Sequence, residues 1–318
     1  MTITDRIDNI TLIDEAHLGT NIPAPRSVKI ELSGRCNFAC TYCARSMRLR
    51  EQRDMDFNTF TRIATDMRES GVEELGLFYL GESFLYPRLV DAIDFAKNKL
   101  NYPYVFLTTN GSIAYADKVR ECMNAGLDSL KFSLNYADEK QFSDITQVNS
   151  KLWWRVLDNI RGAKDARDLV LETSGHKCGL YISYIAYDND QKQKMDTILQ
   201  EMKPYVDEVY ALPLYNQASF VSTVQEALGY TPVAGNLGRL DNLRDSLPCW
   251  ACFTEGHVTW DGKLSACCFD HDGRFHMGDL NTNSFMECWN SDKFIELRTA
   301  HLNKCVDGTV CEQCVIWK

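Results

Sequence analysis

The sequence predicts an α/β protein built on a parallel sheet, either a complete barrel or part of one. Six short apolar runs alternate with amphipathic segments between residues 27 and 212, which is the pattern of successive strand–helix units. This rhythm breaks over residues 233–248, where Gly, Asn and Pro mark a connector. Because the remaining segment has a different pattern, we expect a small α+β domain at the C-terminal end.

Each element follows from its own pattern. The run SVKIEL at 27–32 predicts a strand, and residues 55–71 carry apolar side chains at helical spacing up to a terminating glycine. The same reasoning predicts strands at 74–80, 104–111, 128–135, 179–187 and 207–214, helices at 87–100, 116–126, 151–166 and 191–202, a hairpin over 257–269 and a helix over 284–302. We divide the chain into an N-terminal extension (1–26), a barrel (27–232) and a connector with the small domain (233–318).

The charge balance limits the classes of partner. The chain of 318 residues has 34 basic and 44 acidic side chains, a formal net charge of −10, which is unlike the basic surfaces that bind nucleic acid. No apolar run reaches the length of a membrane-spanning helix, and the N-terminal residues lack the apolar core of a signal peptide. We predict a cytoplasmic protein with no nucleic-acid partner and no membrane segment.

Cysteines are the strongest chemical signal in the sequence. There are 13 of them, an odd number that argues against a disulfide framework in a reducing compartment. Cys36, Cys40 and Cys43 follow the first predicted strand with the spacing C-x3-C-x2-C. Three thiolates this close can hold three irons of a cubane cluster and leave the fourth iron open. Reactive groups lie in such loops, after the strands, in barrels of this kind.

This motif resembles that of the radical S-adenosylmethionine (SAM) enzymes, whose C-x3-C-x-aromatic-C signature is matched by Cys36, Cys40, Tyr42 and Cys43. The resemblance implies a partial (β/α)6 TIM-like barrel that holds a 4Fe–4S cluster with an open iron site. It further implies that this iron binds SAM, that Tyr42 packs near the adenine, and that electron transfer cleaves SAM to a 5′-deoxyadenosyl radical. The electron donor of such an enzyme would be a flavodoxin or ferredoxin.

Two further elements match the family in the expected register. Leu80-Gly81-Glu82 resembles the Gly-Gly-Glu element that contacts the SAM amino group, with Leu80 in place of the first glycine. Ser133 and Asn135, after the fourth strand, match the position that binds the ribose. Each has a simpler interpretation: Glu82 could be a solvated loop carboxylate, and Ser133 and Asn135 could cap the next element.

The C-terminal cysteines resemble a SPASM domain or its shortened form, twitch, through Cys249-x12-Gly262-x4-Cys267 and a terminal Cys-x2-Cys pair. The resemblance implies one auxiliary 4Fe–4S cluster, whereas a four-cysteine zinc site is the alternative. Cys252 competes with Cys249 as a ligand, and Cys268 competes with Cys267. If Cys249 binds the cluster, Cys252 is either a buried inert thiol or a donor that returns a hydrogen atom to a substrate radical. The expected ligands are Cys249, Cys267, Cys311 and Cys314.

One auxiliary cluster on a short chain resembles aminocyclitol dehydrogenases and, with a spare thiol, aminoglycoside epimerases. Residues 1–26 are too few for the leader-binding domain that is usual in peptide-modifying relatives. We therefore expect hydrogen abstraction from a carbinol carbon of a small polar molecule (an amino sugar, an aminocyclitol or an aminoglycoside-like compound), with dehydrogenation or epimerisation as the outcome in a biosynthetic pathway. A peptide or protein maturase, of the RiPP or sulfatase-maturase kind, is the alternative, and a non-enzymatic iron–sulfur or zinc protein is a remote one.

Overall fold

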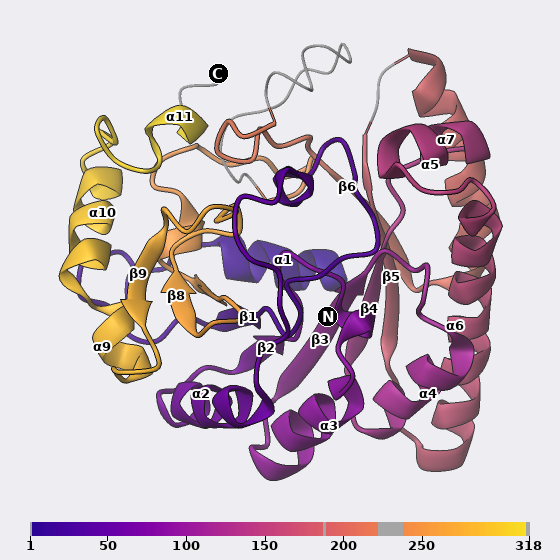
Figure 1. The fold of residues 1–318 in the computed structure, drawn as a ribbon, viewed down its shortest axis with the longest axis horizontal. Helices are drawn as coiled ribbons and strands as arrows, with labels where there is room; N and C mark the ends of the chain where they lie inside the picture. Colours follow the sequence, from indigo (N-terminus) through magenta and orange to yellow (C-terminus); the bar gives the residue numbers. More distant parts are fainter. Residues whose placement is uncertain (1, 187–188, 222–237, 316–318) are drawn as a thin grey trace.

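Six parallel strands form the centre of the protein in a computed structural model that describes residues 2–186, 189–221 and 238–315. Each of these strands pairs with its neighbours in chain order (Figure 1). They are β1 (Ser27–Ile30), β2 (Glu74–Gly76), β3 (Tyr104–Thr109), β4 (Ser129–Ser133), β5 (Gly179–Ile185) and β6 (Glu208–Leu212). The predicted α/β class with a parallel core is confirmed.

Helices connect these strands and cover the outer face of the curved sheet (Figure 1). They are α2 (Phe57–Glu69), α3 (Leu89–Asp94) with a π-helical continuation (Phe95–Lys99), α4 (Ala116–Asn124), α6 (Leu152–Ser174) and α7 (Asn189–Met202). Helix α6 continues past the predicted end at residue 166, because its stop is Gly175 in the left-handed conformation, with φ of 74°. Short 3₁₀ turns occur at Ala44–Met47, Ser83–Leu85, Lys203–Tyr205 and Trp250–Cys252.

Before the C-terminal part of the chain, two helices lie where none was predicted. Helix α1 (Ile3–Thr11) begins with a capping box in which Thr2 and Asp5 bond reciprocally. It lies across the N-terminal ends of the barrel strands, where Glu208, the first residue of β6, accepts the backbone N–H of Ile3 and Thr254 donates to the carbonyl of Ile10. Helix α5 (Glu139–Thr146) follows β4. The predicted N-terminal extension is therefore part of the barrel wall.

The C-terminal part continues the same sheet. Strand β7 (Glu255–Val258) pairs in parallel with β1, and β8 (Lys263–Ser265) and β9 (His276–Asp279) add to it in antiparallel fashion. Among the described residues the strands form one sheet of nine, in the order β6-β5-β4-β3-β2-β1-β7-β8-β9. The expected boundary at residues 232/233 and the start of the connector lie outside the described residues.

The single helix expected over 284–302 is wrong in detail, because it is two helices: α9 (Phe285–Trp289) and α10 (Asp292–Leu302). Ser291 interrupts them and caps the second, since its hydroxyl accepts the backbone N–H of Phe294. The short α11 (Glu312–Val315) follows near the C-terminus.

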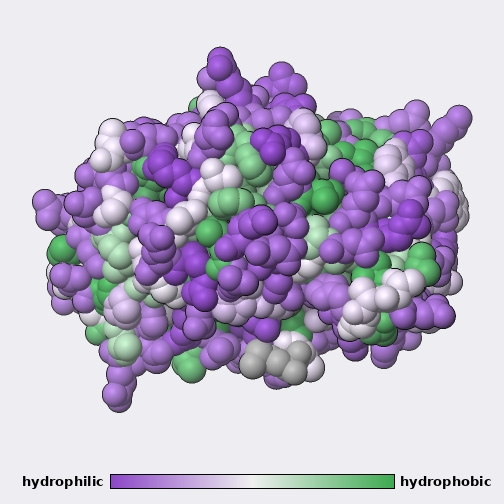
Figure 2. Space-filling model, turned by 90° about the horizontal axis from the view of Figure 1, so that it is seen from below, coloured by the Kyte–Doolittle hydropathy of each residue, from purple (hydrophilic) through white to green (hydrophobic). Residues whose placement is uncertain are grey.

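Hydrophilic residues predominate on the face shown in Figure 2, and hydrophobic residues appear there in small groups. None of the helices in the described ranges has both the length and the apolar character that crossing a membrane requires.

Candidate active site

The three closely spaced cysteines lie in the loop that follows β1, where their side chains line one cavity of about 180 Å³. Helix α5 holds this loop, because Ala39 and Thr41 donate their backbone N–H groups to the last carbonyls of the helix, at 3.0 and 2.9 Å. Phe38 packs edge-on against Phe142 of the same helix. The helix that sequence reasoning missed therefore positions the cysteine loop.

The thiol groups fit an iron–sulfur cluster better than a single metal ion. No three His, Cys, Asp or Glu side chains in the described part of the chain converge closely enough to share one ion. In a cubane cluster each thiolate binds a different iron, so the sulfurs need not converge on one point. Burial raises the pKa of Cys36 to about 11, with the charge of Glu82 as a second cause, and burial also raises the pKa of Cys40 and Cys43. Cluster assembly at these thiols would therefore release protons.

Gly81 brings the second loop of the site against the first. A Cβ atom at this position would lie 1.9 Å from the carbonyl oxygen of Ser33 and 2.6 Å from that of Arg35. The backbone N–H of Glu82 donates to the same Arg35 carbonyl, at 2.8 Å. Only glycine allows this approach, so the Leu80-Gly81-Glu82 turn is fixed beside the cysteine loop.

The Glu82 carboxylate is buried and lines the cavity, so the interpretation of this residue as a solvated loop carboxylate is wrong. It accepts hydrogen bonds from Thr109 Oγ1 and the Asn110 N–H, both at 2.8 Å, and from the Phe84 N–H at 3.1 Å. Burial raises the pKa of Glu82, and these hydrogen bonds oppose the rise. The side chain is thus held rigidly at the edge of β3.

Tyr42 and the end of β4 complete this cavity. Ser133 and Tyr42 both line it, and Asn135 Nδ2 donates to the Tyr42 hydroxyl at 2.8 Å. Asn135 also accepts the backbone N–H of Ile185 at 3.1 Å. Helix α5 is capped instead by Asp138, so Ser133 and Asn135 do not cap it. The expected site residues therefore come together from three separate segments, at the C-terminal ends of β1, β2 and β4.

The C-terminal cysteines gather around a second, largely apolar cavity, which is walled by Phe269, Phe275 and Leu297. Hydrogen bonding with Cys268 and burial raise the pKa of Cys267, and burial raises that of Cys311. Soft-metal ligation suits such buried thiols. The sulfur-bearing residues that line this cavity are Cys249, Cys252, Cys267, Cys311 and Cys314.

The structure bears on the two open choices of ligand, Cys267 or Cys268 and Cys249 or Cys252. Cys267 lines the cavity of the other cysteines, whereas the adjacent Cys268 lines a different cavity inside the barrel. Cys252 lines the cysteine cavity beside Cys249, whose N–H donates to His301 Nδ1 at 3.1 Å. A role for Cys252 as a hydrogen-atom donor stays a prediction.

Tyr79 is a residue that sequence reasoning missed. It lines the cavity of the first cysteines, and its hydroxyl donates to the carbonyl of Cys267 at 2.5 Å. Its ring lies against that of His257, with centroids 5.1 Å apart. Its place at the end of the second apolar run, directly before Leu80, is the signal that could have identified it. Tyr79 joins the two cysteine sites.

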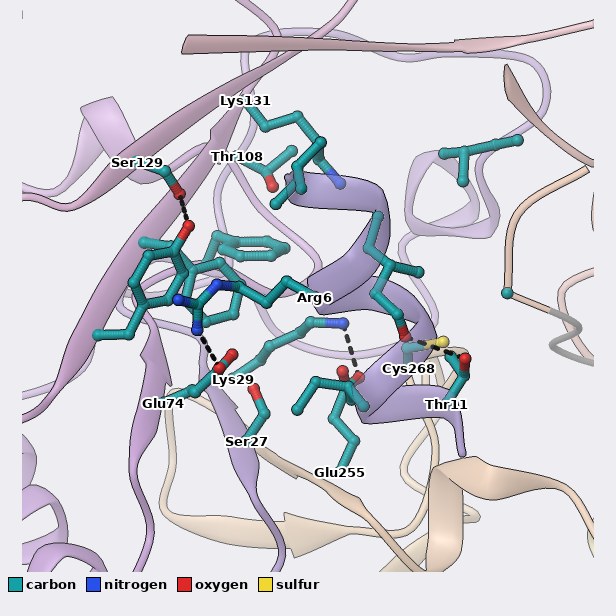
Figure 3. Close-up of a pocket in the computed structure, with 18 of the residues that line it drawn as sticks. Arg6, Thr11, Ser27, Lys29, Glu74, Thr108, Ser129, Lys131, Glu255 and Cys268 are labelled. Atoms are coloured by element: carbon teal, nitrogen blue, oxygen red, sulfur yellow. Dashed lines mark hydrogen bonds and ion pairs between the residues drawn. The ribbon is translucent and has the colours of Figure 1, made fainter. Parts of the chain in front are cut away.

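A third cavity, of about 210 Å³, fills the interior of the barrel (Figure 3). Phe78 and Thr108 line both this cavity and that of the first cysteines, so the two adjoin. Inward-facing residues of β1 to β4, β6 and β7 form its walls, and helix α1 lies across it.

Comparison with known proteins agrees with this arrangement. The radical SAM superfamily model matches residues 30–177, and the model of the iron–sulfur cluster-binding domain SPASM matches residues 249–315. This chain combines a radical SAM domain with a SPASM domain. A 4Fe–4S cluster and SAM are therefore its cofactors, together with an auxiliary iron–sulfur site in the SPASM domain.

Relatives cover nearly the whole chain at low identity. A tungsten-containing aldehyde ferredoxin oxidoreductase cofactor-modifying protein of Pyrococcus furiosus is 22% identical over 320 residues, covering 90% of this chain and 87% of that protein. The structure of BtrN in complex with AdoMet and 2-DOIA aligns with a TM-score of 0.59 and 15% identity, covering 91% of both chains. Streptococcus suis SuiB bound to the precursor peptide SuiA aligns with a TM-score of 0.66 and 13% identity, covering 92% of this chain and 76% of that one. At these identities the two structures show a shared fold.

Proposed function

We propose that this radical SAM enzyme abstracts a hydrogen atom from a carbinol carbon of a small polar substrate, such as an amino sugar or aminocyclitol, and completes a dehydrogenation or an epimerisation. The observation that carries the proposal is the barrel cavity of about 210 Å³, which adjoins the cavity of the three cysteines through Phe78 and Thr108. This volume lies below the roughly 300–1,000 Å³ of sites for drug-sized ligands, so it favours a molecule no larger than one sugar or cyclitol ring. The complex of BtrN with AdoMet and 2-DOIA offers a precedent for a small ligand on this fold.

The residues of the first cavity fit the cofactors of a radical SAM domain. Cys36, Cys40 and Cys43 would hold the cluster. The carboxylate of Glu82 would accept a hydrogen bond from the ammonium group of SAM. When bound and reduced by a flavodoxin or ferredoxin, the cluster and SAM supply a 5′-deoxyadenosyl radical. Tyr42, supported by Asn135, would pack near the adenine, and Ser133 would bond the ribose. These are proposed assignments, and they are supported by the lining of one cavity.

Dehydrogenation must remove an electron from the substrate radical. A cluster held by the C-terminal cysteines could accept it. We propose Cys249, Cys267, Cys311 and Cys314 as ligands of one auxiliary 4Fe–4S cluster, with residues 249–315 as its domain. Cys252, in the same cavity, is then the spare thiol. Tyr79 lies between this group and the first cavity, which favours electron transfer between the two sites.

The test is turnover of the anaerobically reconstituted enzyme with SAM, a reductant and a panel of neutral, amino, acidic and phosphorylated sugars and cyclitols in D₂O. Dehydrogenation gives a product that has lost two hydrogens, and epimerisation gives a product that has gained one deuterium. Each must appear together with 5′-deoxyadenosine and be absent from a Cys36/Cys40/Cys43 triple-Ala variant. Peptides that consume SAM while the whole sugar panel fails would instead establish a maturase, and the proposal would be withdrawn.

A further inference from the structure

Among the residues that the structure describes, the charged side chains that line the barrel cavity are paired, with one exception. Arg6 of α1 forms an ion pair with Glu74 of β2, and Lys29 of β1 lies 2.6 Å from Glu255 of β7 (Figure 3). His257 Nε2 lies 2.7 Å from the same Glu255 carboxylate. Burial by itself would raise the pKa of Glu255, but Lys29 and His257 lower it to about 2, so this group is a carboxylate.

Lys131, in the middle of β4, is the exception. Its ammonium makes no hydrogen bond or ion pair with the described residues, and Figure 3 draws no line from it to another group. Its nearest recorded interactions are with the rings of Phe78 and Tyr210, whose centroids are each 5.9 Å away. Aromatic faces attract a cation only weakly at this distance.

The cavity therefore has an uncompensated positive charge. Its lining includes three cations and two carboxylates, namely Arg6, Lys29 and Lys131 against Glu74 and Glu255. Removing an ammonium from water without a counter-ion is costly, and an enclosed anion would offset that cost. The excess charge makes the barrel interior selective for ligands with a negative group.

The position of Lys131 along β4 places it close to the proposed SAM site. Ser133, two residues further along β4 and on the same face of the strand, lines the cavity of the three cysteines. Two residues of a strand advance by about 6.6 Å. A group bound at Lys131 would thus lie roughly one inward-facing position below the proposed ribose site, and the carbon atoms next to that group would lie closer to the site of hydrogen abstraction.

We propose that the barrel cavity is the substrate site and that Lys131 binds an anionic group of the substrate, either a carboxylate or a phosphate. The inference rests on the proposed function and narrows it. Among carbinol substrates it favours acidic or phosphorylated sugars and cyclitols. It disfavours those amino sugars, aminocyclitols and aminoglycosides that carry only positive charges, because their ammonium groups would meet Lys131.

The titration of Lys131 agrees with this role. Burial, and next the charge of Lys29 on β1, lower the pKa of Lys131 to about 8, and Glu255 of β7 opposes the shift. The other titratable groups that line this cavity are Arg6 and Glu74, which form an ion pair, and Tyr104, Tyr210, Tyr215 and Cys268. Anion affinity should be highest below pH about 8 and decline above it, as the ammonium loses its proton.

The experiment is calorimetric titration of the reconstituted, SAM-loaded protein with four probes on one scaffold: glucuronate, glucose 6-phosphate, glucose and glucosamine. We expect glucuronate or glucose 6-phosphate to bind, and the one that does identifies the anion as carboxylate or phosphate. Lys131→Gln should weaken that binding about tenfold or more, because a hydrogen bond to a charged group is lost. Lys131→Arg, which retains the charge, should restore most of it. Lys118→Gln, which removes an exposed lysine on α4, should bind as the wild type does.

Several outcomes would overturn the inference: equal binding of glucose or glucosamine, no binding of either anion, or unchanged anion affinity in Lys131→Gln. None of these measurements depends on turnover. Formation of 5′-deoxyadenosine by the reduced wild-type enzyme without substrate separately reports radical chemistry. Failure of that reaction with anion binding intact would count against the proposed function, whereas the reverse would count against the anion site.

Discussion

Gly81 and its neighbours illustrate how single residues determine this site. The loop after β2 meets the loop after β1 with backbone against backbone, and the closeness of Ser33 leaves no space for a Cβ atom. The carboxylate of Glu82 is consequently held at one place by three donors rather than by solvent. At the scale of the residue, the site therefore depends on glycine at position 81 as well as on the cysteine thiols.

We expect Gly81→Ala to destabilise the protein by about 1–3 kcal/mol, as overpacking does, and to reduce SAM cleavage strongly by displacing Glu82. Thermal unfolding and the yield of 5′-deoxyadenosine measure the two effects. Gly19→Ala is the matched control, since its Cβ would meet Ile22 at an ordinary 3.4 Å. Wild-type behaviour of Gly81→Ala would contradict the packing argument.

Adjacent cysteines provide a second test at this scale. Cys267→Ala should lose the auxiliary cluster, so that the iron content falls from about eight to about four atoms per chain. Cys268→Ala should retain about eight, because that side chain lines the barrel cavity instead. Iron and sulfide analysis after anaerobic reconstitution measures this. Loss of iron from Cys268→Ala with retention in Cys267→Ala would reverse the assignment.

The buried, unpaired ammonium of Lys131 should lower the free energy of unfolding of the protein. Its pKa is lower in the folded chain than in the unfolded chain, about 8 against 10.5, so the unfolded state binds more protons between these values. Stability should therefore rise with pH across that window. Lys131→Met should stabilise the protein by about 3 kcal/mol at pH 7, and this gain should shrink as the pH rises from 8 to above 10. Denaturant unfolding at several pH values measures it, and a gain that is independent of pH would refute the cause.

At the scale of the element, α1 covers the end of the barrel at which the strands begin. Asp8 pairs with Arg239 at 2.8 Å, and the first turn of the helix donates to Glu208 of β6. The other end bonds to Thr254, just before β7. These contacts make an N-terminal segment the wall of the proposed substrate site, since Ile3, Arg6, Ile7 and Ile10 line the cavity.

Removing Glu208 should loosen this helix. Glu208→Ala leaves the N–H of Ile3 without its acceptor, so we expect a loss of about 1–3 kcal/mol and faster amide exchange over residues 3–11. Glu201→Ala, which removes a partner of Arg161 at the surface, is the control and should change neither. Hydrogen exchange followed by mass spectrometry compares them. Equal protection of α1 in both variants would show that Glu208 does not hold the helix.

At the scale of the whole molecule, the SPASM part and the barrel share one sheet. Strand β1 lies between β2 and β7, so it belongs to both parts at once (Figure 1). The Trp260 turn adds to this connection, because its backbone N–H donates to Glu31, directly after β1, at 3.1 Å. Glu31 is itself paired with Arg50 of the cysteine-bearing loop at 2.7 Å.

Such a shared strand predicts cooperative opening. The amides of β1 and β7 should exchange with the same protection, and the edge strand β6 should exchange faster. Native-state hydrogen exchange in increasing denaturant measures these free energies. A free energy of opening much lower for β7 than for β1 would show that the SPASM part and the barrel unfold as separate units.

Features that depend on residues close together in the chain could be predicted from the sequence alone. The C-x3-C-x2-C loop, the Leu80-Gly81-Glu82 turn and the alternation of strands and helices could all be predicted, because spacing and hydrophobic period are local properties. The same information gave the α/β class. Helix ends were less predictable: α6 ran on to Gly175, and Ser291 divided what had been expected to be one helix.

Which of the two adjacent cysteines lines the cavity of the other C-terminal cysteines depends on the folded chain, since Cys267 and Cys268 lie in a turn after β8, where no strand period predicts side-chain direction. The tertiary structure also decided that β7 pairs with β1, a contact between segments more than 200 residues apart, and that α5 holds the cysteine loop. The lone charge of Lys131 has the same origin. A lysine in a strand is ordinary until the fold surrounds it with partners that are already paired, and those partners come from elements spread over the whole chain.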